Sequence, residues 1–358
     1  MSRKEKVGSS GILFSPISSL LDRNLLPDTL IRQGIRRLLR QRLREEDAGS
    51  PDARQAKLSS FIEHLRKSPI AIETRAANAQ HYEVPTEFYQ SVLGKHMKYS
   101  CGYWPENSTR YHLNESEEAM LALTCERAGL VDGQDILELG CGWGSLSLFM
   151  AQRYPSSQIQ AVSNSRTQKA YIDGQSQARG IANLKIVTAD MNLFETHERF
   201  DRVVSVEMFE HMRNEEALMA KIAGWLKPGG KLFVHIFVHK DFAYTFDVKD
   251  STDWMSRHFF TGGIMPSDDL LLYFQRDLAI ERHWRVDGTH YQRTSEAWLS
   301  RMDENRAAIM PIFEETYGHS DAVKWWVYWR IFFMSCAELW GFRGGTEWFV
   351  SHYLFSKK

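Results

Sequence analysis

Residues 135–148 read DILELGCGWGSLSL, and this stretch decides the fold. It begins with an apolar run long enough for a buried strand and continues into Gly140, Gly142 and Gly144, before an apolar segment with helical spacing. A strand that enters a glycine-rich turn at a helix start lets a ligand approach bare backbone N–H groups. The spacing is G-x-G-x-G, not the G-x-G-x-x-G of dinucleotide-binding folds. Glu138 precedes the turn, where it can hold a ligand's ammonium or hydroxyl group. The stretch predicts a nucleoside-type cofactor, with a plain tight turn as the alternative.

The composition limits the class of protein. The chain has 358 residues, of which 43% are hydrophobic, enough for one large domain or a core domain with additions. A formal net charge of −1 argues against a nucleic-acid partner. The four cysteines are scattered without a C-x-x-C motif, which favours a reducing, cytoplasmic setting and neither a zinc site nor a disulfide framework. No segment approaches 18 uncharged apolar residues, so we expect no membrane-spanning helix.

The N-terminal part has helical patterns over residues 17–44 and 58–67, joined by a polar linker. Arginines between Arg32 and Arg44 form a basic stripe. We interpret this stripe as a solvated helix face, with a membrane-surface or targeting role as the alternative.

After the glycine turn, strand patterns alternate with helical patterns. The strands are predicted at residues 159–162, 184–187, 202–206 and 231–236. This alternation predicts a parallel sheet with helices on both faces and a ligand site at the carboxyl ends of its strands. Residues 238–274 break the pattern and are long for a connector, so we expect them to cap a pocket. A further strand is predicted at residues 279–284, and residues 347–355 are expected to form a hairpin partner at the sheet edge.

The fourth predicted strand runs into VEMFEHM, at residues 206–212. If a helical turn begins there, Glu207, Glu210 and His211 stand at i, i+3 and i+4 on one face, an arrangement suited to proton transfer. The alternative is a surface Glu–His pair at a helix start. A metal site would need further ligands such as His235 and His239, and we expect none.

Several motifs resemble a known family. LELGCGWGS, SNSRTQ, TADMN and SVEMFEHM resemble the S-adenosylmethionine-dependent methyltransferases that include cyclopropane fatty acid synthases. HYEVPTEFYQSVLGKHMKYSCGYW, HKDFAYTFD and FFTGGIMPSDDLLLYFQ look more like the plant coclaurine N-methyltransferase type. The resemblance implies a class I methyltransferase core, an α/β Rossmann-like fold with a seven-stranded, mostly parallel sheet. It also implies an N-terminal helical extension and cofactor-covering loop over residues 1–114. The core would follow over residues 115–358, with acceptor-site insertions around 238–274 and 294–345.

The resemblance also implies roles for individual residues. The three turn glycines would approach the methionine part of S-adenosylmethionine, with Tyr99 and Ser100 closing over it. Asn164 and Gln168 would meet the ribose, while Asp190 and Met191 would hold the adenine. Glu207, Glu210 and His211 would line the acceptor site. Cyclopropane synthases typically read S-x-G-x-F-E-H there, with glycine in place of Glu207.

From these residues we expect an N-methyltransferase that acts on a small, aromatic or alkaloid-like amine. His211, oriented by Glu210, would deprotonate the amine, and Glu207 would anchor it. Aromatic residues near the C-terminal end of the chain are expected to line the acceptor pocket: Trp329, Phe332 and Phe333. The alternative activity is methylene transfer to phospholipid acyl chains, and the non-enzyme alternative is a cofactor-binding module. Apart from the amine substrate, we expect no nucleic-acid partner and no stable membrane insertion. A homodimer is one possible oligomeric state, which the sequence does not decide.

Overall fold

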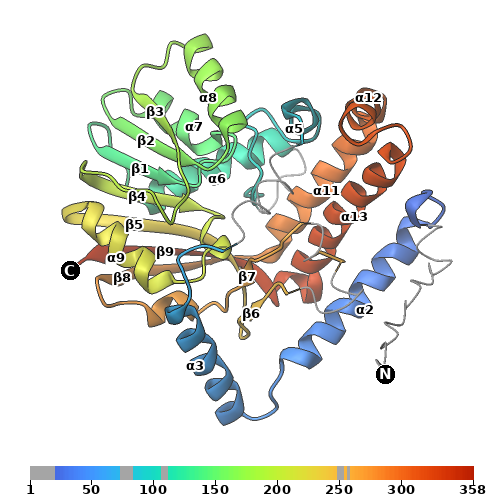
Figure 1. Ribbon diagram of the computed structural model, residues 1–358, viewed down its shortest axis with the longest axis horizontal. Coiled ribbons are helices and arrows are strands. Elements are labelled where there is room, and N and C mark those ends of the chain that lie inside the picture. Colours follow the sequence, from blue (N-terminus) through green and yellow to red (C-terminus); the bar gives the residue numbers. More distant parts are fainter. Residues whose placement is uncertain (1–20, 73–83, 106–111, 248–253, 256–258) are drawn as a thin grey trace, which may run out of the picture.

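The structure is a computed structural model, and it describes residues 21–72, 84–105, 112–247, 254–255 and 259–358. At its centre is a seven-stranded sheet with the strand order β3-β2-β1-β4-β5-β9-β8 (Figure 1). The strands from β3 to β5 run parallel, and β9 runs antiparallel to both of its neighbours. The predicted α/β fold with a seven-stranded, mostly parallel sheet is confirmed.

The elements follow the alternation that the sequence predicts. The sheet contains β1 (Asp135–Leu139), β2 (Gln158–Ser163), β3 (Leu184–Thr188), β4 (Phe200–Val206), β5 (Leu226–His239), β8 (Leu278–Val286) and β9 (Trp348–Lys357). The helices are α2 (Asp28–Glu46), α3 (Pro51–Lys67), α5 (Thr86–Val92), α6 (Leu113–Arg127), α7 (Ser145–Arg153), α8 (Arg166–Ala178), α9 (Glu215–Trp225), α11 (Gly288–Glu304), α12 (Arg306–Tyr317) and α13 (Ala322–Trp340). Short elements complete the fold: β6 (Tyr244–Thr245), β7 (Ile264–Met265), and the 3₁₀ turns η1 (Phe209–His211), η2 (Leu270–Tyr273) and η3 (Phe342–Gly345). Residues 17–20 of the first predicted helical pattern lie outside the described residues.

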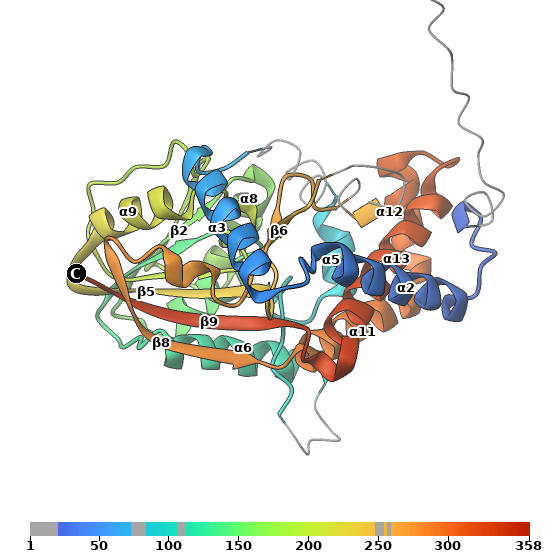
Figure 2. The same ribbon diagram turned by 90° about the horizontal axis from the view of Figure 1, so that it is seen from below.

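The sheet is covered on both faces. Figure 2 shows it from its edge, with α3 and α9 on one side and α6 on the other. Because both faces are covered, β1 has apolar residues on both of its faces, and Ile136, Leu137 and Leu139 are fully buried. Helices α11, α13 and α2 lie beyond one end of the sheet, with α2 packed on α13 (Figure 1).

The position predicted for the last strand is wrong. Residues 347–355 were expected at the sheet edge, but β9 lies between β5 and β8, and β8 is the edge strand. The alternation of Trp348, Val350 and His352 suggested one buried face. However, the residues between them, Phe349 and Ser351, are also buried. A strand buried on both faces belongs inside a sheet, whereas β8 exposes charged residues along its length.

Candidate active site

The glycine turn follows β1, and its φ angles are +79° at Gly140, +52° at Gly142 and +78° at Gly144. A Cβ atom at Gly140 would lie 2.6 Å from the Met208 Cγ, and one at Gly144 would lie 2.6 Å from the Ile172 Cγ1. A Cβ at Gly142 would meet none of the described atoms within 4 Å. Two of these glycines therefore permit close packing of the chain, and Gly142 leaves the backbone open to a ligand.

We expect a Gly144→Ala substitution to lower the free energy of unfolding by about 2–4 kcal/mol. A left-handed alanine costs about 1–2 kcal/mol, and its methyl group would overpack against Ile172 for about 1–3 kcal/mol more. Gly174, inside α8, is the matched control, because a Cβ there meets no described atom within 4 Å. Gly174→Ala should stabilise the protein by about 0.5–1 kcal/mol. Urea unfolding measures both changes, and a Gly144→Ala variant as stable as the wild type would contradict the packing role.

A cleft opens at the carboxyl ends of β1 to β4, where ligands bind in sheets of this type. Its lining comes from the loops after these four strands and from two other segments: Ala71, Ile72, Gly140, Gly142, Val162, Ser163, Asn164, Gln168, Ala189, Asp190, Met191, Glu207, Met208, His211, Met212, Thr261 and Gly262. Six of the predicted cofactor residues thus lie together: Gly140, Gly142, Asn164, Gln168, Asp190 and Met191.

The side chain of Gln168 fits a ligand with hydroxyl groups. It is buried, and its Oε1 accepts a hydrogen bond of 2.7 Å from the Ser163 Oγ. Its Nε2 has no hydrogen-bond partner among the described residues. A buried amide donor without a partner on the wall of a cleft is suited to a ribose hydroxyl.

Four other predicted cofactor residues do not line this cleft. Glu138 is buried beneath the glycine turn, where its carboxyl accepts a hydrogen bond from the Ser147 hydroxyl. Burial raises the pKa of Glu138 to about 7. Gly144 faces α8, as described above, and Tyr99 lines a second cavity. The Ser100 hydroxyl accepts a hydrogen bond from the Lys98 ammonium.

The second cavity has a volume of about 640 Å³ and meets the cofactor cleft at Glu207 and His211, which line both. Glu210 also lines it. Most of its wall is apolar, contributed by the inner face of α2, by one face of α13, and by residues between β5 and β8 such as Phe246 and Phe260. That residues 238–274 cap a pocket stays a prediction, and 248–253 and 256–258 lie outside the described residues.

Only one of the three aromatic residues predicted for the acceptor wall lies on this cavity. Phe332 lines it, whereas Trp329 is fully buried against Phe88 and Tyr89. Phe333 packs against the Trp329 ring in the same core. Apolar residues occupy most of the circumference of helix α13, so its sequence does not show which of them meet the cavity. The observed face instead follows a helical spacing: Ile331, Phe332, Ser335, Cys336, Leu339 and Trp340.

Glu207 stands where the two cavities meet, and three donors hold its carboxylate. The Cys101 N–H donates to Oε1 at 3.0 Å, and the Tyr291 hydroxyl donates to Oε2 at 2.6 Å. The His235 Nε2 lies 3.2 Å from Oε1. Burial raises the pKa of Glu207, while the Lys98 ammonium and the Cys101 and Tyr291 donors lower it. A non-glycine residue with a φ of +49° is also strained, a feature found most often at functional sites.

The predicted helical turn that would align the two acids and the imidazole does not form. Only Phe209–His211 is helical, as a 3₁₀ turn, because Glu207 has a left-handed backbone. No hydrogen bond joins Glu210 to His211 in the part of the chain that the structure describes, and the Glu210 Oε2 has no partner there. The loop nevertheless brings all three side chains to the wall of the second cavity.

Burial favours the uncharged forms of both His211 and Glu210. Burial lowers the pKa of His211 to about 4, so its imidazole is neutral at physiological pH and can accept a proton. Burial, and the carboxylate of Glu207 next to it, raise the pKa of Glu210 well above its usual range. A cationic ligand in the cavity would lower the pKa of Glu210 and favour its carboxylate form.

Sequence reasoning missed Lys98, Tyr291 and the role of α2. Lys98 is fully buried in a stretch that reads as an ordinary loop, and only the fold reveals its glutamate neighbours. Tyr291 lies 84 residues from Glu207 in the sequence. The apolar periodicity of α2 signalled a buried face, but the sequence does not say that this face lines a cavity.

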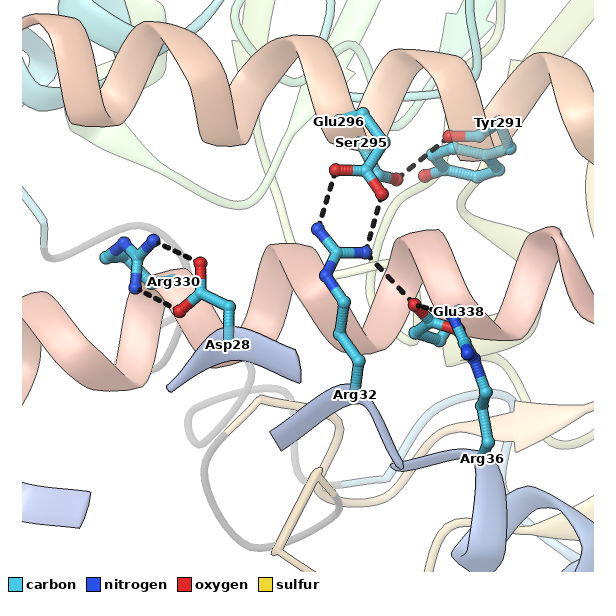
Figure 3. A network of polar contacts seen from close by, with 8 residues as sticks. All are labelled: Asp28, Arg32, Arg36, Tyr291, Ser295, Glu296, Arg330 and Glu338. Atoms are coloured by element: carbon cyan, nitrogen blue, oxygen red, sulfur yellow. Dashed lines mark hydrogen bonds and ion pairs between the residues drawn. The ribbon is translucent and has the colours of Figure 1, made fainter. Parts of the chain in front are cut away.

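Ion pairs fasten α2 to the two helices that flank the cavity (Figure 3). Arg32 bridges Glu296 of α11 and Glu338 of α13, at 2.6 Å and 3.1 Å. Arg36 also pairs with Glu338, and Arg330 of α13 forms a two-pronged contact with Asp28. Two arginines of the predicted basic stripe therefore bind carboxylates of this chain, which argues against their holding a lipid surface.

The described residues contain no group of three or more histidine, cysteine or acidic side chains arranged to hold a metal ion. His239, offered by the sequence as a metal ligand, pairs instead with Glu347 at 3.4 Å. None of the described helices is long and apolar enough to cross a membrane.

Comparisons with known proteins match most of the chain to one family and to its named relatives. Residues 71–342 match a family model described as mycolic acid cyclopropane synthetase. The (S)-coclaurine N-methyltransferase of Thalictrum flavum subsp. glaucum is 40% identical over 342 residues, covering 94% of each chain. A crystal structure of coclaurine N-methyltransferase bound to N-methylheliamine and SAH superimposes with a TM-score of 0.92 at 40% identity, covering 95% of this chain and 99% of that one. The cyclopropane-fatty-acyl-phospholipid synthase of Escherichia coli K12 is 29% identical, over 62% of this chain and 55% of that protein.

Proposed function

Since the chain belongs to the mycolic acid cyclopropane synthetase family and is an S-adenosylmethionine-dependent methyltransferase, we propose that it methylates the nitrogen of a small aromatic or alkaloid-like amine. The observation that carries this proposal is the Glu207 carboxylate at the junction of the two cavities. A buried anion attracts an ammonium ion but gives no benefit to a lipid alkene, and its desolvation costs several kcal/mol, roughly. The relatives named as N-methyltransferases support the same choice.

The cofactor cleft would hold S-adenosylmethionine through the open backbone at Gly142, the Gln168 amide, Asn164, Asp190 and Met191. When bound, S-adenosylmethionine would supply an electrophilic methyl carbon for attack by an amine lone pair, with the thioether S-adenosylhomocysteine as the leaving group. We assign Tyr99, which lines the acceptor cavity, to the boundary between the two ligands.

The remaining residues prepare the amine. Glu207 binds the ammonium form, which has no lone pair and cannot react. His211, neutral at physiological pH, removes a proton from that nitrogen. A cation in the cavity would lower the pKa of Glu210, so that its carboxyl releases its proton to solvent and the resulting carboxylate stabilises the imidazolium. Proton transfer by a positioned base is typically worth about 10²–10⁴-fold, and alignment of the nitrogen with the methyl group adds to this.

The proposed activity is tested with methyl-labelled S-adenosylmethionine and two panels of acceptors. One panel contains cyclic aromatic amines, and the other contains phospholipid vesicles with unsaturated acyl chains. Label should accumulate in an amine and not in the lipid. Label in the lipid alone would favour the methylene-transfer alternative and would overturn the assignment of Glu207 as an amine anchor.

Loosening α2 should weaken amine binding alone, because α2 lines the acceptor cavity and not the cofactor cleft. Arg32→Gln removes the bridge to Glu296 and Glu338. We expect the amine KM to rise about 3–10-fold and the Kd for S-adenosylhomocysteine to stay within about twofold, since a charged hydrogen bond contributes about 1.5–3 kcal/mol before solvent screening. Arg37→Gln, on the exposed face of the same helix, is the control and should change neither constant. Equal KM values for the two variants would show that the ion pairs do not shape the cavity.

A further inference from the structure

A row of polar side chains crosses the sheet from Glu207 to the end of α6. The backbone places them in register, with His235 of β5 opposite His352 of β9. The His235 Nε2 lies 3.2 Å from the Glu207 Oε1, and the His235 Nδ1 lies 2.9 Å from the His352 Nε2. The row ends at Arg127 of α6, whose Nη1 lies 2.8 Å from the His352 Nδ1. Both imidazoles are fully buried, so no water competes for these contacts.

Arg127 gives this row a direction. A guanidinium can donate hydrogen bonds but cannot accept them, so the His352 Nδ1 must be a bare acceptor. The proton of His352 is then on Nε2, which donates to the His235 Nδ1. By the same reasoning the His235 proton is on Nε2 and is donated to the Glu207 Oε1. Every link therefore points toward Glu207.

The same direction sets the chemical state of Glu207. Its Oε1 accepts from His235 and from the Cys101 N–H, and its Oε2 accepts from the Tyr291 hydroxyl. A proton on Oε1 would face two donors, and a proton on Oε2 would require the Tyr291 hydroxyl to turn and accept it. Without Arg127, the two imidazoles could exchange tautomers, and the bare Nε2 of His235 would then favour a protonated Glu207. Burial, together with the cations Lys98 and Arg127, lowers the pKa of His235 well below its usual range, so the ring carries one proton and not two.

We propose that Arg127, His352 and His235 are positioning residues, a directional hydrogen-bond chain that keeps Glu207 an acceptor and hence a carboxylate able to bind an amine. This inference rests on the proposed function only for the role of Glu207. The direction of the chain follows from the geometry alone, so the two can be tested apart. The pH dependence of the Glu207 charge also depends on the charged and titratable groups that surround it: Lys98, Cys101, Glu210, His211, His235 and Tyr291.

The first experiment reads the tautomers and needs no substrate. Protein with ¹⁵N-labelled histidine is examined by NMR, in which protonated and bare ring nitrogens have distinct shifts. His352→Phe and Arg127→Leu spectra assign the signals. In the wild type, both His235 and His352 should carry the proton on Nε2. In Arg127→Leu, which leaves both rings in place, the fixed pattern should be lost. An Nδ1-protonated ring in the wild type, or an unchanged pattern in Arg127→Leu, would overturn the proposal.

The second experiment reads the effect on Glu207. His352→Phe keeps the ring shape but breaks the chain, whereas His352→Gln keeps both an acceptor and a donor. For His352→Phe we expect the amine KM to rise about 10-fold with kcat nearly unchanged, an effect typical of residues one step behind a ligand. The acid limb of kcat/KM should move about one pH unit higher, because the carboxylate loses support and its pKa rises. His352→Gln should restore both values toward the wild type.

The outcomes separate the two proposals. If the wild type methylates amines but His352→Phe shows the wild-type KM and pH profile, the positioning role fails and the proposed function stands. If the affinity for S-adenosylhomocysteine and the melting temperature fall in step with activity while the pH profile stays in place, the three residues are merely structural and the inference is wrong. If the wild type methylates no amine, the proposed function fails, and the NMR experiment still decides the direction of the chain.

Discussion

The His211→Ala variant is expected to lose about 10²–10⁴-fold in kcat for amine methylation while its Kd for S-adenosylhomocysteine stays within about threefold of the wild type. His211 lines both cavities, so its imidazole lies between the cofactor cleft and the acceptor. Because burial lowers its pKa to about 4, the imidazole is a neutral base throughout the physiological range and is lost as a base only as the pH falls toward 4. No other neutral imidazole among the described residues lines the acceptor cavity to replace it.

Stopped-flow or steady-state assays give kcat, and calorimetry gives the cofactor affinity. His319→Ala is a suitable control, since His319 is 87% exposed and contacts Glu314 on the surface. This control should keep full activity. If His211→Ala retains turnover within about tenfold of the wild type, His211 is not the base, and Glu210, whose Oε2 lacks a partner among the described residues, becomes the next candidate.

The Glu207→Gly variant is expected to raise the amine KM by about 30-fold or more, with a much smaller change in cofactor affinity. Removing one member of a buried charge pair typically costs about 2–5 kcal/mol of binding. Glycine also relieves the left-handed backbone at this position, which has a φ of +49°, so the variant should fold. The three donors around the carboxylate would be left for water to satisfy.

Glu207→Gln gives the matched comparison, because it keeps the side-chain volume and removes only the charge. Its amide nitrogen would face hydrogen-bond donors, so this variant should bind the amine no better than Glu207→Gly does. Steady-state kinetics with a range of amine concentrations, together with calorimetry for S-adenosylhomocysteine, separate the two constants. An unchanged KM in both variants would reject the amine-anchor role.

The sheet, the glycine turn and most of the cofactor cleft were predictable because they depend on local signals. Strand–helix alternation predicts a parallel sheet, and in such a sheet the strand ends bring Gly142, Gln168 and Asp190 together. The order of the last two strands was not predictable in the same way. An alternating pattern does not distinguish a one-faced edge strand from a central strand whose other residues are also apolar.

The details of the acceptor site needed the structure because they depend on contacts distant in sequence. Glu207 was predicted to begin a helical turn, but its backbone is left-handed and its carboxylate accepts a hydrogen bond from Tyr291, which is distant in sequence. Gly144 has the spacing of a ligand-binding glycine yet makes room for Ile172. Apolar residues occupy most of the circumference of α13, so helical periodicity could not separate Phe332, on the cavity, from Phe333, in the core.

One measurement tests most directly whether an intact methyl group passes to a nitrogen at this site. S-adenosylmethionine with a CD₃ group is incubated with the enzyme, a cyclic aromatic amine and unsaturated phospholipid vesicles, and the products are analysed by mass spectrometry. Transfer to nitrogen keeps every deuteron, whereas methylene addition to an alkene loses one to the base. We expect the amine to gain a complete CD₃ group. Unlabelled amine together with CD₂-containing acyl chains would contradict the assignment of Glu207, Glu210 and His211 to an amine.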